Sequence, residues 1–215
     1  MITYIYRETK RKDLTMQEKI TTSIIIALIF CFLYYLLIKY LRYKKQRVLF
    51  TDLEKQDFEK FDKDVNSWVT KMVFPRYNVE YIKLNRYLLD DKKDKIEEQF
   101  DLLLNAARGL EQHNDIVARA FDYYVYEENK DKVDPLFEDI KTSKNETLIQ
   151  HATLLYDILI LNKANHIESM EKTFEKGSGV QKQIDALLLE RQYRNINNKE
   201  KASFYENFLK EPLNK

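Results

Sequence analysis

The longest apolar stretch of the chain, ITTSIIIALIFCFLYYLLI at residues 20–38, contains no charged side chain over 19 positions. As a helix it would extend about 28 Å, close to the roughly 30 Å hydrocarbon core of a bilayer. Tyr34, Tyr35, Tyr40 and Tyr43 gather at its C-terminal end, as in an interfacial aromatic belt. A cleaved signal peptide fits poorly, because the run is long and KYLRYKK follows it in place of small residues. We therefore expect a permanent transmembrane helix in contact with lipid.

Basic residues flank this run on both sides. Five Lys/Arg lie within residues 7–19, and five more follow the run. We call the second group the basic collar: Lys39, Arg42, Lys44, Lys45 and Arg47. Basic flanks argue against the alternative of a buried core helix. The equal counts on the two sides do not decide the orientation by the positive-inside rule. The collar side, however, has no acidic residue before Asp52, which favours a cytoplasmic C-terminal body on the cell membrane. Translation from Met16 instead of Met1 would favour the same orientation, and the collar can contact anionic headgroups.

Residues 51–74 carry apolar side chains at three- and four-residue steps, which predicts one amphipathic helix. Its apolar stripe comprises Phe58, Phe61, Val65, Trp68, Val69, Met72 and Val73. Thr51 or Asp52 would cap its start, and Pro75 would end it. We expect this helix to cover the first repeat of the body, with Trp68 in the core instead of at a binding hot spot.

The rest of the chain repeats one pattern four times. An apolar residue at the end of one helix is followed nine positions later by an apolar or small residue in the next. The pairs are Tyr87/Ile96, Tyr124/Val133, Ile158/Ile167 and Tyr193/Ala202, at offsets of 37, 34 and 35 residues. Polar turns such as DDKKDK and EENKDK lie between them. Gly109, Gly177 and Gly179 fall where second helices end and a left-handed C-cap is expected. A fixed period of helical hairpins predicts stacking, since one hairpin cannot bury both of its apolar faces.

These positions resemble the tetratricopeptide-repeat (TPR) family. There an aromatic near the end of the first helix is followed nine positions later by a small or apolar residue of the second helix. Another aromatic comes four positions after that residue, and a further apolar residue comes three positions later still. The matching residues are Tyr87, Ile96, Phe100 and Leu103 in the first copy and Tyr124, Val133, Phe137 and Ile140 in the second. The chain departs from the family at Glu171 and Glu206, which replace the second aromatic. It departs again where Leu84, Phe121, Leu155 and Glu190 replace the first-helix glycine. The resemblance covers about residues 77–211, and a related α-solenoid stays open.

Pro135 also departs from the repeat pattern, and two structures are compatible with it. It would start a delayed second helix after an Asp134 cap, or bend a helix that has already begun. If the hairpins stack as in the TPR family, the first helix of each lines a concave face. The side chains expected there are Tyr81, Asn85, Asp122, Tyr126, Tyr156, Arg191 and Arg194. Tyrosine and arginine are enriched at binding hot spots, which favours a protein or peptide partner.

Composition narrows the fold and the function. The chain has 215 residues with only three glycines and three prolines, which favours an all-α fold. Residues 1–47 hold ten Lys/Arg and three acids; since the whole chain is +1, the remainder is −6 and unsuited to nucleic acid. Cys31 is the single cysteine, and no catalytic, metal or cofactor motif is present, so no enzyme and no cofactor are expected. Arg108 and His113 have the R-x-x-x-x-H spacing of HEPN-type ribonucleases, a weaker enzymatic alternative.

We therefore expect an all-α protein with a single N-terminal transmembrane helix and an α-solenoid of about four TPR-like repeats. Its expected parts are a polar, basic segment (1–19), the transmembrane helix with its collar (20–47), an amphipathic linker or capping helix (48–76) and the repeat domain (77–215). The expected function is that of a membrane-anchored scaffold or adaptor. The alternative is a structural subunit of a larger membrane complex.

Overall fold

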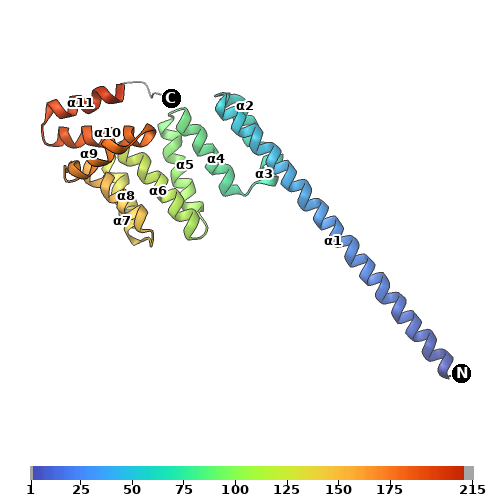
Figure 1. Ribbon diagram of the computed structural model, residues 1–215. Helices are drawn as coiled ribbons and strands as arrows, with labels where there is room; N and C mark the ends of the chain where they lie inside the picture. The colour runs from blue at the N-terminus through green and yellow to red at the C-terminus, as the bar shows by residue number, and fades with distance from the viewer. Residues whose placement is uncertain (1, 211–215) are drawn as a thin grey trace. The chain divides into compact units, whose positions relative to one another are not determined.

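The computed structural model describes the backbone of residues 2–210 and the side chains of residues 16–210. Within these residues every secondary-structure element is helical and there is no strand (Figure 1). The expected all-α fold is therefore confirmed for the described chain. The chain divides into two compact units, Met1–Gln99 and Phe100–Lys215, and each is described by itself below.

The first unit begins with α1 (Ile2–Glu54), a helix that continues without a break through the apolar run and the basic collar (Figure 1). Its part from Met16 to Glu54 is long and apolar enough to cross a membrane, and its most apolar window is not buried. The hydroxyls of Thr21 and Thr22 donate to the carbonyls four residues earlier, at 2.9 and 2.8 Å. These two side chains therefore need no partner outside the helix.

The C-terminal part of α1 belongs to the hydrophobic core of the first unit. Leu49 is 1% exposed and Leu53 is 6% exposed, and Ile38 and Leu41 are partly buried against the same cluster. The other side of this core comes from α2 (Phe58–Val65), α3 (Trp68–Val73) and α4 (Arg76–Leu89). The core thus makes contact with α1 from the last residue of the apolar run onward.

Residues 51–74 do not form the single helix that their pattern predicts. Thr51 and Asp52 lie inside α1 and do not cap a new helix. The side chain of Asp57 instead caps α2, and that of Ser67 caps α3 by accepting from the amide of Thr70. The side chains of Ser67 and Thr70 both donate to the carbonyl of Asp64 (2.8 and 2.7 Å), which fixes the break between the two helices.

This break has turned Trp68 away from the core. The stripe of apolar residues would be continuous only on an unbroken helix; α3 buries Thr70 and Val73 and leaves Trp68 73% exposed and Met72 47% exposed. The prediction that Trp68 is a core residue is therefore wrong. The predicted stop at Pro75 is confirmed, because α3 ends at Val73 and Pro75 directly precedes α4. Helix α5 (Lys93–Ala106) follows, and its Gln99 side chain donates to the carbonyl of Glu80 at 3.1 Å.

The second unit contains consecutive antiparallel helices (Figure 1). They are α6 (Leu110–Tyr126), α7 (Lys130–Thr142), α8 (Glu146–Leu155) with the π-helical turn η1 (Tyr156–Ile160), α9 (Ile167–Lys176), α10 (Gly179–Asn195) and α11 (Lys199–Lys210). Helix α6 packs on α7 and α8, and α10 packs on α9 and α11. Fully buried Ile116, Phe121, Val133, Ile158 and Leu189 lie in its core.

The polar turns contain residues in the left-handed backbone conformation at regular intervals. Positive φ angles occur at Gln56, Asp91, Glu128, Asn162 and Asn197, at intervals of 35, 37, 34 and 35 residues. In four of these turns the amide after the left-handed residue donates to the carbonyl five residues earlier, as in a Schellman motif. The turn at Asn162, which follows the π-helical turn η1, differs. There the amide of Lys163 donates to the carbonyl of Asp157, six residues earlier, at 2.8 Å.

The glycines do not supply these caps. Gly109 and Gly179 have positive φ angles of 82° and 58°, but they lie at the starts of α6 and α10. Gly177 follows α9 with an extended backbone, so the expectation of left-handed glycine C-caps after the second helices is wrong. Pro135 lies inside α7, which begins at Lys130 under an Asn129 cap; a delayed helix after Asp134 is therefore also wrong.

Candidate functional site: a pocket at the end of the apolar run

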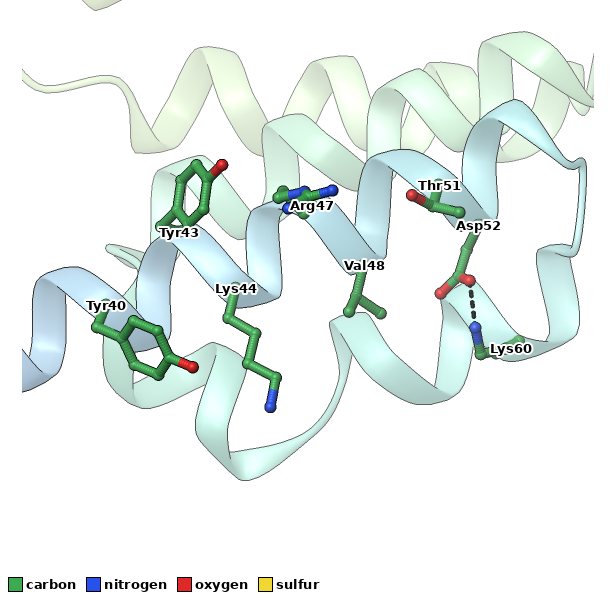
Figure 2. Close-up of a pocket in the computed structure, with 8 residues that line it drawn as sticks. All are labelled: Tyr40, Tyr43, Lys44, Arg47, Val48, Thr51, Asp52 and Lys60. Carbon is green, nitrogen blue, oxygen red and sulfur yellow. Dashed lines mark hydrogen bonds and ion pairs between the residues drawn. The ribbon is translucent and has the colours of Figure 1, made fainter.

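A shallow pocket of about 400 Å³ lies where α1 leaves the apolar run and meets α2 (Figure 2). Its lining consists of Tyr40, Tyr43, Lys44, Arg47, Val48, Thr51, Asp52 and Lys60. Seven of these residues come from α1, so helical spacing alone brings them to one surface. The pocket therefore follows directly from an uninterrupted α1.

The fold divides the basic collar between two faces of α1. On the face that packs on α2 and α3, the Nε of Arg42 donates to the carbonyl of Val73 at 2.8 Å, and the Nζ of Lys45 lies 2.6 Å from a carboxylate oxygen of Asp64. Lys39, Lys44 and Arg47 are exposed, and within the described part of the chain these three form no ion pair. Two collar cations are thus used inside the protein, and three remain available.

Within the pocket, Lys60 does not contribute free positive charge. Its Nζ lies 2.6 Å from an oxygen of Asp52, a side chain that is 1% exposed, and this hydrogen bond raises the pKa of Lys60. The second carboxylate oxygen of Asp52 is buried and has no hydrogen-bond partner in the described protein. The uncompensated charge of the pocket therefore comes from Lys44 and Arg47, beside the hydroxyl groups of two tyrosines.

The seven residues predicted to bind a partner are distributed over both compact units. Tyr81 and Asn85 lie half-buried on α4 in the first unit, where the Tyr81 ring lies 6.1 Å from that of Tyr77. In the second unit, Asp122 on α6 bonds to His151 on α8 at 3.0 Å and raises the pKa of that histidine. Tyr126, on the same helix as Asp122, is 45% exposed.

The remaining three are held by contacts within the second unit. The Tyr156 hydroxyl donates to Asp134 at 2.8 Å, and its ring stacks on Phe137 with centroids 4.2 Å apart. Arg191 lies 2.6 Å from Glu128 and 3.4 Å from the side-chain oxygen of Asn162, both left-handed turn residues. Arg194 pairs with Glu190 and Glu206. Of the five predicted residues in this unit, Tyr126 is the exposed one without a polar partner in the described chain.

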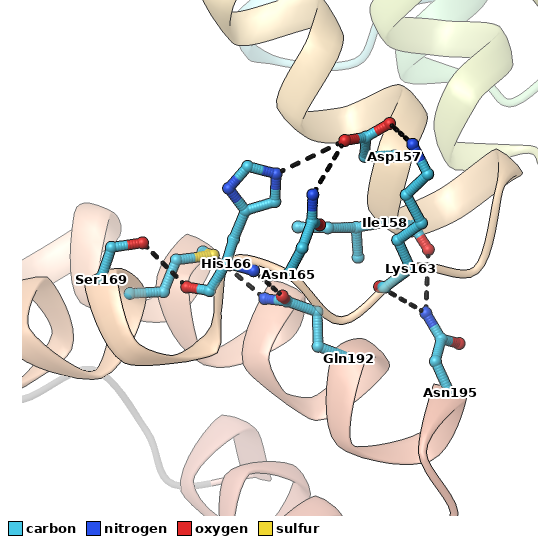
Figure 3. Close-up of polar contacts among 9 residues, drawn as sticks. Asp157, Ile158, Lys163, Asn165, His166, Ser169, Gln192 and Asn195 are labelled. Atoms are coloured by element: carbon cyan, nitrogen blue, oxygen red, sulfur yellow. Dashed lines mark hydrogen bonds and ion pairs between the residues drawn. The ribbon is translucent and has the colours of Figure 1, made fainter.

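A cluster of polar side chains holds the loop between η1 and α9 against α10 (Figure 3). The side-chain amide of Asn195 donates to the carbonyls of Ile158 and Lys163, both at 3.1 Å. Gln192, fully buried, accepts from the amide of His166 at 2.9 Å. Asp157 in turn binds Lys163 at 2.8 Å. These bonds satisfy the backbone groups that the π-helical turn leaves unpaired, so the cluster is structural.

Glu171, which replaces the family's aromatic residue, joins α9 to α10 and α11. Its carboxylate accepts from the hydroxyls of Tyr193 (2.6 Å) and Tyr205 (3.2 Å), and Lys201 lies 3.2 Å away. Burial and the neighbouring carboxylate raise the pKa of Tyr193 to about 12, while the hydrogen bond from Tyr193 lowers the pKa of Glu171. No sequence pattern indicates this cluster, because its members are far apart in the chain.

Arg108 and His113 have separate contacts within the described chain. Arg108 lies exposed in the loop before α6, and its backbone amide donates to the side chain of Gln112. The Nε2 of His113 instead lies 2.8 Å from Asp139 on α7. Among the described residues, no three His, Cys, Asp or Glu side chains gather in a metal-binding arrangement.

Comparison of the chain with protein-family models, with curated proteins and with solved structures finds no match. The sequence predicts only part of this pocket. The charge of the collar is evident from the sequence, whereas the ion pair of Asp52 and Lys60 depends on the turn at Gln56 that brings α2 back along α1.

Proposed function

We propose that this protein is a single-pass membrane scaffold whose helical-hairpin domain holds a protein or peptide partner at the membrane surface, with the C-terminal domain in the cytoplasm. The observation that carries the proposal is the continuity of α1, which passes from the apolar run into the core at Leu49 and Leu53 without a linker. A domain attached in this way has a fixed distance from the bilayer. That property suits a protein that positions another.

The domain is proposed to be an α-solenoid of the TPR type. Support comes from the regular left-handed turns and from the packing of successive hairpins within the second unit. The first of these turns, at Gln56, precedes the four expected repeats by one period. Phe61, nine positions after Asp52, is fully buried, as are Ile96 and Val133 at the same place in later hairpins. The C-terminal part of α1 and α2 therefore qualify as an additional hairpin of the series.

Tyr126 is the best candidate for a partner contact on the first helices. Its side chain is exposed at the edge of a polar surface. Partial burial and the nearby Asp122 raise the pKa of Tyr126 above its ordinary value. Replacing an exposed aromatic hot-spot residue by alanine commonly weakens binding by about 2 kcal/mol, roughly thirtyfold. The same change at Phe204, which is 58% exposed on the second helix α11, provides a matched control.

The test is purification of the full chain in mild detergent, followed by determination of the mass and composition of the complex. A stoichiometric protein partner that is lost with Tyr126→Ala and retained with Phe204→Ala would support the scaffold. A chain that purifies alone would contradict it. RNA cleavage abolished by Arg108→Ala would instead favour the ribonuclease alternative.

One observation favours the alternative of a structural subunit in a larger membrane complex. Val180, Ile184 and Leu187 form an exposed apolar stripe along α10, with exposed fractions of 64%, 39% and 40%. A permanent neighbour would cover such a stripe. Leu187→Glu would then release the chain from the complex, whereas a scaffold that binds through its first helices near Tyr126 would retain its partner.

A further inference from the structure

We propose that the pocket at the end of the apolar run binds the phosphate-bearing headgroup of an anionic phospholipid. The inference rests on the membrane-anchored part of the proposed function and adds a defined ligand site to it. The ligand chemistry is that of a phosphate ester: one negative charge or more, with oxygens that accept hydrogen bonds.

The depth of the pocket matches the headgroup layer. Tyr40 and Tyr43 lie two and five residues beyond Ile38, so they are about 3 and 8 Å along the helix axis from the end of the apolar run. The headgroup layer extends about 5–7 Å beyond the hydrocarbon core on each side. Tyr40 therefore lies at the depth of the headgroup layer and Tyr43 at its outer edge, and Lys44 follows one residue later.

The direction of the Arg47 side chain brings its cation back to the level of Tyr43. Side chains of a helix tilt toward its N-terminus, and in α1 that direction leads back to the apolar run. Arg47 follows this rule, because its guanidinium carbon lies 5.9 Å from the centroid of the Tyr43 ring, one turn closer to the membrane. Figure 2 shows Lys44 and Tyr40 extending from the same side of α1. Long basic side chains reach the interface in this way while their backbone stays outside.

The charge of the site suits one phosphate. Lys60 is neutralised by Asp52, whereas Lys44 and Arg47 have no acidic partner in the described structure. The pocket thus offers two positive charges and two phenolic donors to one anion. Its open shape, about 400 Å³ in volume, would admit a headgroup from the bilayer side.

The test uses the full chain in nanodiscs of phosphatidylcholine with a minority of phosphatidylglycerol, released into native mass spectrometry. We expect one phosphatidylglycerol to be retained on the wild-type chain. Lys44→Gln with Arg47→Gln should weaken this retention about thirtyfold, because the bound phosphate loses both of its cationic partners. The matched control is Lys39→Gln with Lys71→Gln, which removes two exposed cations near the membrane but outside the pocket; we expect a loss of no more than about threefold.

Each outcome has a defined meaning. Equal losses in the two double variants would overturn the site in favour of general surface attraction. Displacement of the retained lipid by inorganic phosphate or glycerol phosphate in solution would overturn the lipid as the source of the phosphate. A wild-type chain that enters nanodiscs but retains no anionic lipid would overturn this inference alone. A chain that does not enter nanodiscs would contradict the proposed function itself.

Discussion

Leu49→Ala tests whether the collar region of α1 is part of the folded domain. Leu49 is 1% exposed and lies in the cluster that contains Phe61, Val65 and Val73. Truncation of a fully buried leucine to alanine removes its hydrophobic burial and leaves a cavity, at a cost of about 2–5 kcal/mol. We take about 3 kcal/mol as the expected value, because the surrounding helices are short and can partly relax.

Phe50 provides the internal control for this change. It is the next residue of α1, but it is 47% exposed, so Phe50→Ala should cost less than about 1 kcal/mol. Sequence alone gives no reason to separate two neighbouring apolar residues that follow a long apolar run. The difference between the two variants therefore isolates the packing of α1 on α2 and α3 from general effects on the apolar run.

The assay is amide hydrogen exchange of the full chain in nanodiscs, followed over peptides from α2 and α3. A loss of about 3 kcal/mol should accelerate exchange there by roughly a hundredfold for Leu49→Ala, with little change for Phe50→Ala. Equal exchange rates in the two variants would refute the argument. In that case the apolar run and the core of the first unit would be connected loosely, and the continuity of α1 would not fix the position of that core.

Three further predictions concern other parts of the chain. Trp68, the single tryptophan and 73% exposed, should be quenched efficiently by acrylamide; strong protection would return it to the core. Glu171→Gln should lower the pKa of Tyr193 from about 12 toward its ordinary value of 10.0, measured by ultraviolet titration; an unchanged value would assign the shift to burial alone. Since the folded-state pKa of Tyr193 is raised, its stabilising contribution is complete below pH 10.0 and is lost as pH rises through about 12. Asn195→Ala should destabilise the α8–α9 connection by about 2 kcal/mol through two lost hydrogen bonds, seen as faster amide exchange there, whereas the exposed Asn207→Ala should not.

The sequence predicted the features that depend on local patterns. A charge-free run of apolar residues is sufficient to predict the long N-terminal helix. The polar turns at Asp91, Glu128 and Asn197 each lie between two apolar positions that are nine residues apart, so local spacing predicts them as well. The turn at Gln56 has the same spacing, since Phe61 follows Asp52 by nine positions. It was missed because an aspartate occupies the position of the repeat tyrosine, so the signal was present but incomplete.

The features that the patterns do not predict depend on individual side-chain contacts, some of them local and some between residues far apart in the chain. The helix break before Trp68 is fixed by the Ser67 and Thr70 side chains at the Asp64 carbonyl, which periodicity does not register. The division of the collar was not predictable either, because charge counts do not say which face of a helix will pack. Residue type likewise does not indicate the contacts of Tyr156 and Arg191, which both have partners inside the second unit.

Because α1 is uninterrupted, it fixes the orientation of the core of the first unit about the helix axis, as well as the distance of that core from the apolar run. Each residue of an α-helix turns the chain by about 100° and advances it by about 1.5 Å. One residue added between Leu37 and Ile38 would leave both the apolar run and the core of the first unit intact, yet it would rotate that core by more than a quarter turn around the axis of α1. Surrounding lipid is the same in every direction around the helix axis and would tolerate this rotation. A neighbouring protein that contacts both the apolar run and the domain would not.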